Sequence, residues 1–454
     1  MKRRDALKTI GALAGATAGS KFLGGCGSDD GGETGITTLV VLCMENRSYD
    51  HYLGPRALEG LGGDGLTAGM SNPRTNAGPA EIFHETISCI PDPPHSWASS
   101  RAQFAEGQNN GFMQEYQRTR GPNVPPHVMG YFTRDDLPFS WALADAYATS
   151  DRWFSSMMGP TWPNRMYLHS GQSGGLNSNE LPSAGGIDWP SIHNQLSQAG
   201  IDWGYYFQDL PFVPLFKDAE VTGRVRRLNN QFWRDAKEGT LPAVTWLEPN
   251  FDLNDDHPPH HQMLGQQFMA SVYGALAQSP QWNNCMLVIL YDEHGGYFDH
   301  VPPPLADDAL ASSGFDQLGF RIPAFVAGPY VKQGYVSSVV RDHCSVLSHI
   351  TKKYGLEPLT QRVAWAPDLS DFIDQERLEA GDPRPPVAMP EIVVDESSLT
   401  GACARVTPSQ PELAALADMG FFGEHDLRHR RLEDGYAIGD VAEALGVGRI
   451  RRGR

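Results

Sequence analysis

The stretch NCMLVILYDEHGGYFDHVPPP, residues 284–304, combines a long apolar run with a cluster of polar residues. Residues 286–291 are apolar without alternation, which is typical of a strand buried on both faces of a parallel sheet. Asp292 and Glu293 follow at once. Open α/β sheets bind ligands beyond the carboxyl ends of their strands, so this pattern predicts a site at the end of a central strand. The alternative is a buried strand followed by an ordinary polar turn.

A second stretch repeats this pattern far away in the chain. Residues 39–44, LVVLCM, predict another buried strand, and Glu45 and Asn46 come directly after it. Glu45, Asn46, Asp292 and Glu293 all offer oxygen atoms, and three carboxylates with one amide suit a hard divalent cation. We therefore predict that these four residues hold a metal ion.

The remaining pattern alternates between strands and helices. This alternation predicts a mostly parallel sheet with helices on both faces, that is, an α/β fold built as a three-layer α/β/α sandwich. The predicted strands also include residues 201–207, 243–247 and 322–327, and the predicted helices cover residues 137–147, 191–199, 229–237, 264–277 and 345–354.

A candidate nucleophile lies in MGPTWPNRMYL, residues 158–168. Residues 164–171 fit a short helix closed by glycine, so Thr161 is expected just before a helix N-terminus, where unpaired N–H groups favour negative charge. A metal ion makes a hydroxyl nucleophilic near neutral pH, and Thr161 would also complete the metal's ligand shell. Arg165, about one turn further on, could stabilise the alkoxide or clamp a phosphoryl oxygen. The alternative is that Thr161 is an ordinary helix cap.

Several histidines could protonate a leaving group. His95 follows three prolines in PDPPHSW, residues 91–97, and His257 lies in a turn after a predicted strand. One or more of these histidines is expected at the site, and the others are expected to be solvated loop residues. The candidates are His95, His257, His294 and His343.

Substrate contacts are predicted for His343 and for two aromatic residues of the strand at 201–207. Tyr205 and Tyr206 could enclose a choline group through cation–π attraction. The alternative is that both tyrosines are ordinary strand and core residues.

The composition narrows the class of protein. The chain has 454 residues and a formal net charge of −18, which argues against nucleic-acid binding and is compatible with a cation site. The five cysteines after Cys26 show no CxxC spacing, so a zinc knuckle is not expected. Cys43 and Cys285 fall within predicted strands and are expected to be small core residues.

The N-terminus resembles an export signal. KRRDALK, residues 2–8, is close to a twin-arginine signal, and LGGC, residues 23–26, resembles a lipobox whose cysteine is lipidated. We expect the export machinery of that route as a partner, a membrane anchor at Cys26, and a periplasmic or cell-surface location. The alternative is that Cys26 lies near a cleavage site by chance.

Four regions are predicted from these observations. Their bounds are 1–26 for the export signal with the lipobox, 27–35 for a flexible tether, 36–375 for the catalytic domain, and 376–454 for a C-terminal extension with a charged helix at 426–445.

Several motifs together resemble a bacterial phosphoesterase family that includes non-haemolytic phospholipases C and an acid phosphatase. The resemblance spans roughly residues 36–374. The motifs are ENRSYDHYLG at 45–54, GPTWPNR at 159–165, DHPP at 256–259 and DEHGGYFDHVPP at 292–303.

The resemblance implies an alkaline-phosphatase-like fold and a metal-dependent phosphoric ester hydrolase. It implies one divalent metal ion, with calcium and zinc as the leading candidates, on Glu45, Asn46, Asp292 and Glu293. Thr161 would be the nucleophile and would form a phosphothreonine intermediate, while His95 and His257 would bind phosphate or move protons.

The substrate is expected to be a phosphocholine-type diester, including phospholipid, because a threonine nucleophile resembles the phospholipase C branch. Two alternatives stay open. One is an acid phosphatase acting on phosphomonoesters, and the other is a non-catalytic surface lipoprotein with the same fold.

Overall fold

The computed structural model describes residues 35–182, 185–401 and 409–452. The predicted export signal, the lipobox with Cys26 and nearly all of the tether lie outside these residues. No helix in the described residues has the length and apolar character needed to span a membrane.

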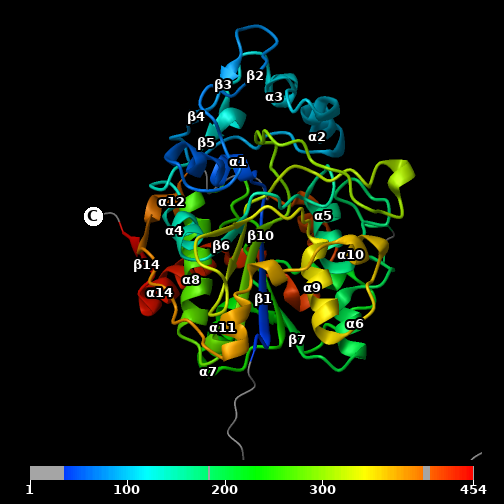
Figure 1. The fold of residues 1–454 in the computed structure, drawn as a ribbon, viewed down its shortest axis with the longest axis vertical. Helices are drawn as coiled ribbons and strands as arrows, with labels where there is room; N and C mark the ends of the chain where they lie inside the picture. Colours follow the sequence, from blue (N-terminus) through cyan, green and yellow to red (C-terminus); the bar gives the residue numbers. More distant parts are fainter. Residues whose placement is uncertain (1–34, 183–184, 402–408, 453–454) are drawn as a thin grey trace, which may run out of the picture. The chain divides into compact units, whose positions relative to one another are not determined.

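An eight-stranded sheet forms the centre of the fold (Figure 1). The strand order is β12-β6-β11-β10-β1-β9-β7-β8, and only β11 runs antiparallel to its neighbours. This confirms the predicted mostly parallel sheet. The strands are β1 (Thr38–Met44), β6 (Ala148–Ser150), β7 (Trp203–Phe207), β8 (Val225–Arg227), β9 (Val244–Glu248), β10 (Cys285–Tyr291), β11 (Ala324–Ala327) and β12 (Tyr335–Ser337).

The two strands with polar ends lie side by side in the middle of this sheet. Every residue of β1 and β10 is buried, as expected for strands covered on both faces. Their parallel register pairs Met44 with Tyr291, so the residues that follow leave the sheet at the same level. Cys43 and Cys285 are buried free cysteines, as predicted.

Helices cover both faces of the sheet, which confirms the three-layer α/β/α architecture (Figure 1). One layer contains α4 (Pro138–Ala146), α7 (Trp233–Glu238) and α8 (Gln262–Ala277). The other contains α5 (Thr161–Ser170), α6 (Ile192–Gln198), α9 (Cys344–Tyr354) and α10 (Gln361–Trp365).

Several predicted boundaries differ from the structure. Thr161 is the first residue of α5, and Pro160 holds the cap position. The strand predicted at 322–327 begins only at Ala324, since Pro323 has no N–H to donate to a neighbouring strand. The helix predicted at 229–237 begins as a π-helical turn over Leu228–Phe232 before α7.

A long segment after β1 lies beyond the carboxyl end of the central strands (Figure 1). It has its own small apolar cluster, which includes Phe112, Met113 and Tyr116. Its elements are α1 (Tyr49–Tyr52), β2 (Ser71–Asn72), β3 (Ala80–Glu81), β4 (Phe83–His84), α2 (Trp97–Phe104), α3 (Phe112–Arg120) and β5 (Gly130–Tyr131).

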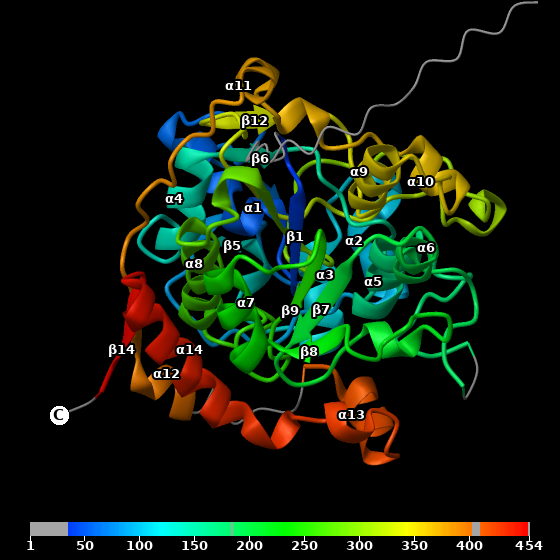
Figure 2. The ribbon, with the colours of Figure 1, turned by 90° about the horizontal axis from the view of Figure 1, so that it is seen from below.

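The C-terminal region packs on the same core as the sheet. Ile392, Leu399 and Leu413 belong to the main apolar cluster, and Figure 2 shows α12, α13 and α14 along one flank of the fold. The predicted charged helix begins at Arg431, after 3₁₀ turns. The elements are α11 (Gln375–Ala380), β13 (Ile392–Asp395), α12 (Glu396–Thr400), α13 (Pro411–Asp418), α14 (Arg431–Leu445) and β14 (Gly448–Arg451).

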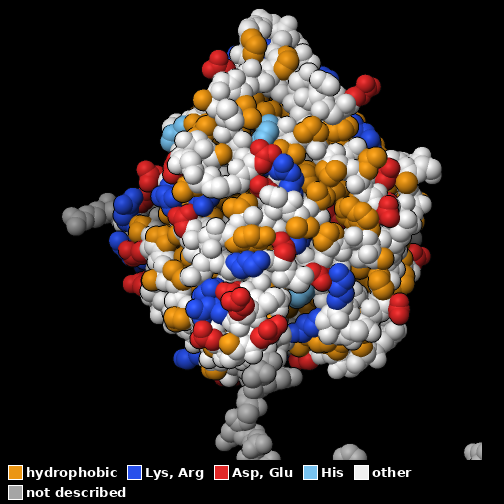
Figure 3. Space-filling model, viewed as in Figure 1, with side chains coloured by type: hydrophobic (Ala, Val, Ile, Leu, Met, Phe, Trp, Pro, Cys, Tyr) orange, Lys and Arg blue, Asp and Glu red, His pale blue; other side chains and the backbone are white. Residues whose placement is uncertain are grey.

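Charged side chains of both signs are intermixed over the face drawn in Figure 3. The polar residues that matter for chemistry are instead buried at the carboxyl end of the sheet.

Candidate active site and metal centre

The four predicted metal ligands lie together at the ends of β1 and β10. Glu45, Asn46, Asp292 and Glu293 are fully buried, and the backbone N–H of Asn46 donates to Asp292 Oδ1 at 3.0 Å. Gly295 makes this approach feasible, because a Cβ there would lie 2.1 Å from the carbonyl oxygen of Asn46. Gly295 also has a positive φ of 63°.

Three oxygen atoms of this group receive no hydrogen bond from the described residues. They are Asn46 Oδ1, Asp292 Oδ2 and Glu293 Oε1. Buried polar atoms normally have a hydrogen-bond partner. Arg165 Nε lies 3.6 Å from Asp292 Oδ2 and His95 Nε2 lies 3.8 Å from Glu293 Oε1, and both distances exceed those of a hydrogen bond. Amide and carboxylate oxygens are the ligands that hard divalent cations prefer. The donor set therefore fits the predicted metal ion.

Electrostatics favour a cation at the same place. Burial and the neighbouring Asp292 raise the pKa of Glu45 well above its usual value. Burial raises the pKa of Asp292 to about 7 although Arg165 opposes the shift, and burial likewise raises the pKa of Glu293 to about 7 against the effect of His95. A bound cation would stabilise the charged form of each carboxyl group.

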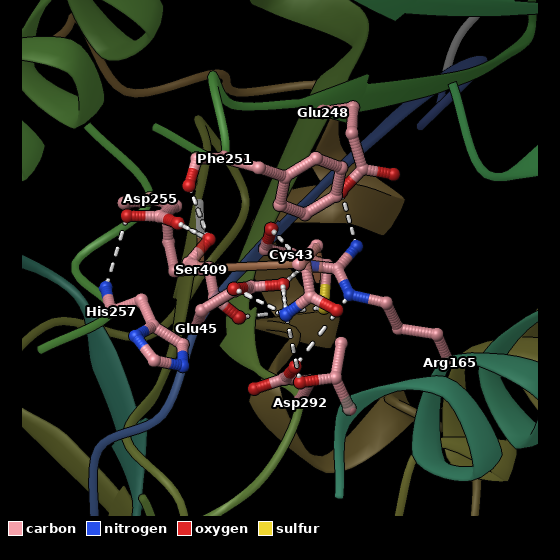
Figure 4. Close-up of polar contacts among 12 residues, drawn as sticks. Cys43, Glu45, Arg165, Glu248, Phe251, Asp255, His257, Asp292 and Ser409 are labelled. Atoms are coloured by element: carbon pink, nitrogen blue, oxygen red, sulfur yellow. Dashed lines mark hydrogen bonds and ion pairs between the residues drawn. The ribbon is translucent and has the colours of Figure 1, made fainter. Parts of the chain in front are cut away.

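Arg165 holds the carboxylates from the α5 side (Figure 4). Its guanidinium is fully buried, lies 3.3 Å from Glu45 Oε1 and 3.6 Å from Asp292 Oδ2, and makes a close ion pair with Glu248. Nη2 also donates to the carbonyl of Cys43 at 3.3 Å. Arg165 is thus placed to orient metal ligands, in addition to any contact with a phosphoryl oxygen.

Glu248 is a site residue that the sequence interpretation did not include. It is the last residue of β9, next to β1 in the sheet. The same pattern that singled out Glu45 was present here, because an acidic residue ends a buried apolar strand.

Thr161 lies at the N-terminus of α5 and is almost completely buried. Gln410 covers it, because Gln410 Nε2 donates to Thr161 Oγ1 at 3.2 Å and to Glu45 Oε2 at 3.0 Å. Gln410 Oε1 accepts from the indole N–H of Trp162 at 3.1 Å, which fixes the orientation of the amide. One side chain therefore links the predicted nucleophile to a predicted metal ligand.

Gln410 could not be found from the sequence. It lies 249 positions after Thr161 and precedes α13 without a recognisable motif. The only sequence property that it shows, a glutamine before a proline, is common in surface turns.

His95 and His257 lie next to each other, and His95 lies beside the buried carboxylate of Glu293. Their ring centroids are 5.9 Å apart in an edge-on arrangement. His95 Nδ1 donates to the carbonyl of Pro93 at 2.8 Å, and its Nε2 lies 3.8 Å from Glu293 Oε1. His257 Nδ1 donates to the carbonyl of Pro258 at 2.5 Å. Both rings are held in place by backbone groups.

The two histidines differ in charge. Burial alone would lower the pKa of His95, but Glu293 and Asp92 outweigh it and raise the pKa to about 9. Burial lowers the pKa of His257 to about 4. Asp92, His95 and His257 also offer ligand atoms that lie within 4.8 Å of one another, which is a second arrangement able to hold a metal ion.

A cavity of about 470 Å³ opens at these histidines, and we call it the catalytic cavity. Its lining residues include Asp92, His95, Arg120, Asn179, His257 and Glu412. Two imidazoles and a guanidinium therefore line the cavity, and one of the imidazoles, that of His95, lies 3.8 Å from the buried carboxylate of Glu293.

His343 does not reach this cavity, contrary to its predicted role as a substrate contact. Its Nδ1 accepts from the backbone N–H of Ser156 at 3.1 Å, and its Nε2 donates to the carbonyl of Tyr291 at 3.0 Å. Both ring nitrogens are thus used within the fold, where they hold the end of β10.

Tyr205 and Tyr206 are also buried away from the catalytic cavity. The Tyr205 hydroxyl donates to Glu248, and the Tyr206 hydroxyl donates to Asp235 at 2.8 Å. Successive residues of a strand point to opposite faces, so the two rings cannot enclose one choline group. Their positions correct the predicted role and favour the alternative of strand and core aromatics.

Comparisons with known proteins show the family of this chain. A model of the phosphoesterase family matches residues 36–357. The non-specific phospholipase C6 of Arabidopsis thaliana is 33% identical, in an alignment that covers 86% of this chain and 82% of that protein. The non-specific phospholipase C1 of the same plant is 34% identical over 73% of this chain and 69% of that protein.

A bacterial relative and a solved structure were also found. Phospholipase C A of Mycobacterium tuberculosis is 30% identical over 75% of this chain and 77% of that protein. A protein in the alkaline phosphatase superfamily from Vibrio parahaemolyticus is 10% identical, with a TM-score of 0.39 over 74% of this chain and 70% of that chain.

The family match extends over most of the chain and includes Glu45, Thr161 and Asp292. The plant relatives add more than 30% identity over most of the length of both proteins. This chain therefore belongs to the phosphoesterase family and is a hydrolase of phosphoric esters.

Proposed function

We propose that this protein is a metal-dependent phosphodiesterase of the phospholipase C type, which cleaves phosphocholine-type esters through a phosphothreonine at Thr161. One observation carries the proposal. Gln410 donates hydrogen bonds to both Thr161 and Glu45, and the nearby carboxylates of Asp292 and Glu293 each have an oxygen that accepts no hydrogen bond from the described residues. The relatives named phospholipase C support the choice of a diester.

Five residues fit the metal ion: Glu45, Asn46, Thr161, Asp292 and Glu293. When bound there, a divalent cation supplies Lewis acidity, which lowers the pKa of a coordinated hydroxyl and offsets charge on a phosphoryl group. Arg165 fixes two of the carboxylates through ion pairs at 3.3 and 3.6 Å.

Thr161 Oγ attacks phosphorus, so that the Thr161 O–P bond forms and the P–O bond to the leaving alcohol breaks. The hydroxyl proton of Thr161 passes to the imidazole of His257, which is neutral because burial lowers its pKa to about 4. The N-terminus of α5 stabilises negative charge at this position, because its first N–H groups have no partner within the helix. His95, on the wall of the catalytic cavity, is charged because its pKa is about 9, and it donates the proton that the leaving alkoxide needs. Water then attacks the phosphothreonine, so that a new O–P bond forms and the Thr161 O–P bond breaks. His95, now neutral, accepts the proton of that water, and His257 returns a proton to Thr161 Oγ.

The test compares two chromogenic substrates, p-nitrophenylphosphorylcholine and p-nitrophenyl phosphate, with and without a chelator. We expect cleavage of the choline diester that the chelator abolishes and that added metal restores. Cleavage of the monoester alone would replace the proposal by the acid phosphatase alternative. Bound metal without activity on either ester would exclude these two substrates and leave the proposed chemistry in place. Loss of metal binding in the purified protein would favour the non-catalytic alternative.

Thr161→Ala tests the nucleophile directly. We expect turnover of the choline diester to be lost. The melting temperature and the number of metal ions bound per protein molecule should change little, because Asp292 and the other carboxylates remain. Thr400→Ala, at an exposed position of α12, is the matched control and should keep full activity. Turnover at the wild-type rate in a clean Thr161→Ala preparation would exclude Thr161 as the nucleophile.

A further inference from the structure

The loop after β9 contains a buried carboxylate that takes no part in the proposed reaction steps. Asp255 is fully buried and precedes His257 by two residues. Its Oδ1 accepts the backbone N–H of His257 at 3.0 Å and the Nδ1–H of His260 at 2.5 Å. The first of these contacts is that of an Asx turn, in which an aspartate side chain fixes the backbone two residues further on. Asp255 therefore holds the turn that carries His257 (Figure 4).

The backbone of Asp255 meets the predicted metal centre. Its carbonyl oxygen accepts the N–H of Glu45 at 2.8 Å. Glu45 follows β1, which pairs in parallel with β9, so this hydrogen bond joins the two segments again beyond the carboxyl ends of their strands. One residue thus contacts a predicted metal ligand through its backbone and the turn of His257 through its side chain.

The second carboxylate oxygen of Asp255 contacts the C-terminal segment. The hydroxyl of Ser409 donates to Asp255 Oδ2 at 3.0 Å, as Figure 4 shows. The next residue along the chain, Gln410, donates to Glu45 Oε2 at 3.0 Å and to Thr161 Oγ1 at 3.2 Å. These contacts close a ring that begins and ends at Glu45.

Asp235 shows what a buried carboxylate does when it only supports the fold. It lies on α7 and accepts hydrogen bonds from the Tyr206 hydroxyl at 2.8 Å and from Arg226 at 3.3 Å. Neither partner belongs to the candidate active site. Asp255, by contrast, contacts a metal ligand and the turn of a catalytic histidine.

We propose that Asp255 is a positioning residue, which holds His257 at a fixed distance from the metal ligand Glu45. This inference rests on the proposed function, in which His257 accepts the proton of Thr161. Asp255 is absent from the described lining of the catalytic cavity, so it acts through the residues that it holds. The effect is expected to be large, because a shift of about 1 Å between reacting groups can cost about a hundredfold in rate.

A double-mutant cycle on kcat tests the positioning role. We expect Asp255→Ala to lower kcat for p-nitrophenylphosphorylcholine about a hundredfold, with a change in KM of less than about twofold. In a His257→Ala background the same change should cost only about threefold, because the residue that Asp255 positions is already gone. Asp255→Asn keeps the Oδ1 acceptor and should retain kcat within about fivefold of the wild type. An equal loss from Asp255→Ala in both backgrounds would overturn the inference.

Asp235→Ala is the matched control for loss of a buried carboxylate. It should lower the free energy of unfolding and keep kcat within about twofold of the wild type, since its partners lie outside the site. A loss of kcat as large as that of Asp255→Ala would overturn the inference, because it would assign the effect to stability.

Ser409→Ala tests the ring with less disturbance of the fold, and it decides the question if Asp255→Ala does not fold. It leaves the turn of His257 in place and removes one contact of Asp255. We expect kcat to fall about threefold in the wild type and to stay unchanged in a Gln410→Ala background, since both changes open the same ring. The same threefold loss in both backgrounds would overturn the ring.

A binding measurement separates this inference from the proposed function. Calorimetry of the metal-loaded protein with inorganic phosphate should show about tenfold weaker binding for Asp255→Ala than for the wild type, and no further loss when His257→Ala is already present. Equal phosphate binding by Asp255→Ala and the wild type would overturn the positioning role. Failure of the wild type to cleave any diester, with the difference in phosphate binding intact, would instead overturn the proposed phosphodiesterase function.

Discussion

Two buried clusters near the carboxyl end of the sheet each combine an arginine with carboxylates. They differ in how many of their polar atoms make hydrogen bonds. The Arg165 cluster consists of Arg165, Glu45, Glu248 and Asp292. The Arg321 cluster consists of Arg321, Asp50, Asp299 and His300. Each arginine is fully buried and pairs with more than one carboxylate. Both clusters draw residues from the same two motifs, at 45–54 and 292–303.

The clusters differ in whether their polar atoms are satisfied. Arg321 Nε donates to Asp299 at 2.9 Å, its Nη2 donates to Asp50 at 3.0 Å, and its Nη1 donates to backbone carbonyls. In the Arg165 cluster, by contrast, Arg165 Nε and Asp292 Oδ2 have no hydrogen-bond partner among the described residues. A satisfied buried network stabilises the fold, whereas a buried carboxylate oxygen that accepts no hydrogen bond is able to bind a cation.

Asp292→Asn should give the largest effect of the variants that separate the two clusters. It removes the charge of a predicted metal ligand, and a metal ion supplies several kcal/mol of charge stabilisation in such reactions. We expect hydrolysis of p-nitrophenylphosphorylcholine to fall about a thousandfold, and calorimetry to show weaker binding of Ca²⁺ or Zn²⁺. Metal affinity and turnover at wild-type levels would remove Asp292 from the ligand set.

Asp299→Asn is the matched control in the Arg321 cluster. It leaves Arg321 with one buried carboxylate fewer, and breaking a buried ion pair costs about 3 kcal/mol of unfolding free energy. We expect urea unfolding to show that loss, while the metal affinity of the folded protein stays close to that of the wild type. A loss of metal affinity as large as that of Asp292→Asn would mean that the two clusters do not differ in function.

The central part of the site was predictable because it depends on local pattern. Apolar runs without alternation identified β1 and β10, and their parallel register then brings Glu45 close to Asp292. The same pattern cannot show that Asp292 is a predicted metal ligand whereas Asp299 is hydrogen-bonded to Arg321. Which arginine each carboxylate contacts depends on the folded structure. Tyr205 and Tyr206 were assigned to the substrate for the same reason, since residue type does not show which face of a strand a ring lies on.

The C-terminal contribution to the site was not predictable. Gln410 meets Thr161 only because α13 packs its inner residues, Leu413 and Ala417, on the main core. No strand pattern or motif precedes that contact. The metal ligands thus follow from the central strands, while the residue that covers the nucleophile depends on tertiary packing of a distant segment.

Gln410→Ala tests how much an uncharged hydrogen-bond donor contributes to the Arg165 cluster. Its amide donates to Glu45 and Thr161, and such hydrogen bonds contribute about 1 kcal/mol each. We expect kcat for the choline diester to fall about tenfold with a smaller change in KM, as for a positioning residue. Gln278→Ala, at an exposed position, is the control. A rise in kcat would show instead that Gln410 obstructs the site.

His300→Gln should give the smallest effect, and only on stability. Burial alone would lower the pKa of His300, but its hydrogen bond to Asp50 and the charge of Asp299 outweigh burial and raise the pKa to about 9. Because this value exceeds the pKa of about 6.5 expected in the unfolded chain, the charged imidazole stabilises the fold fully below about pH 6.5. That stabilisation is lost as the pH rises through about 9.

The measurement is the difference in unfolding free energy between the wild type and His300→Gln at two pH values. We expect the variant to be less stable by about 1 kcal/mol at pH 6 and nearly equal at pH 9.5, since Gln keeps a donor for Asp50 but carries no charge. An equal loss at both pH values would assign the effect to packing. A pH-dependent loss without any change in metal affinity would confirm that the Arg321 cluster stabilises the fold and does not hold the metal ion.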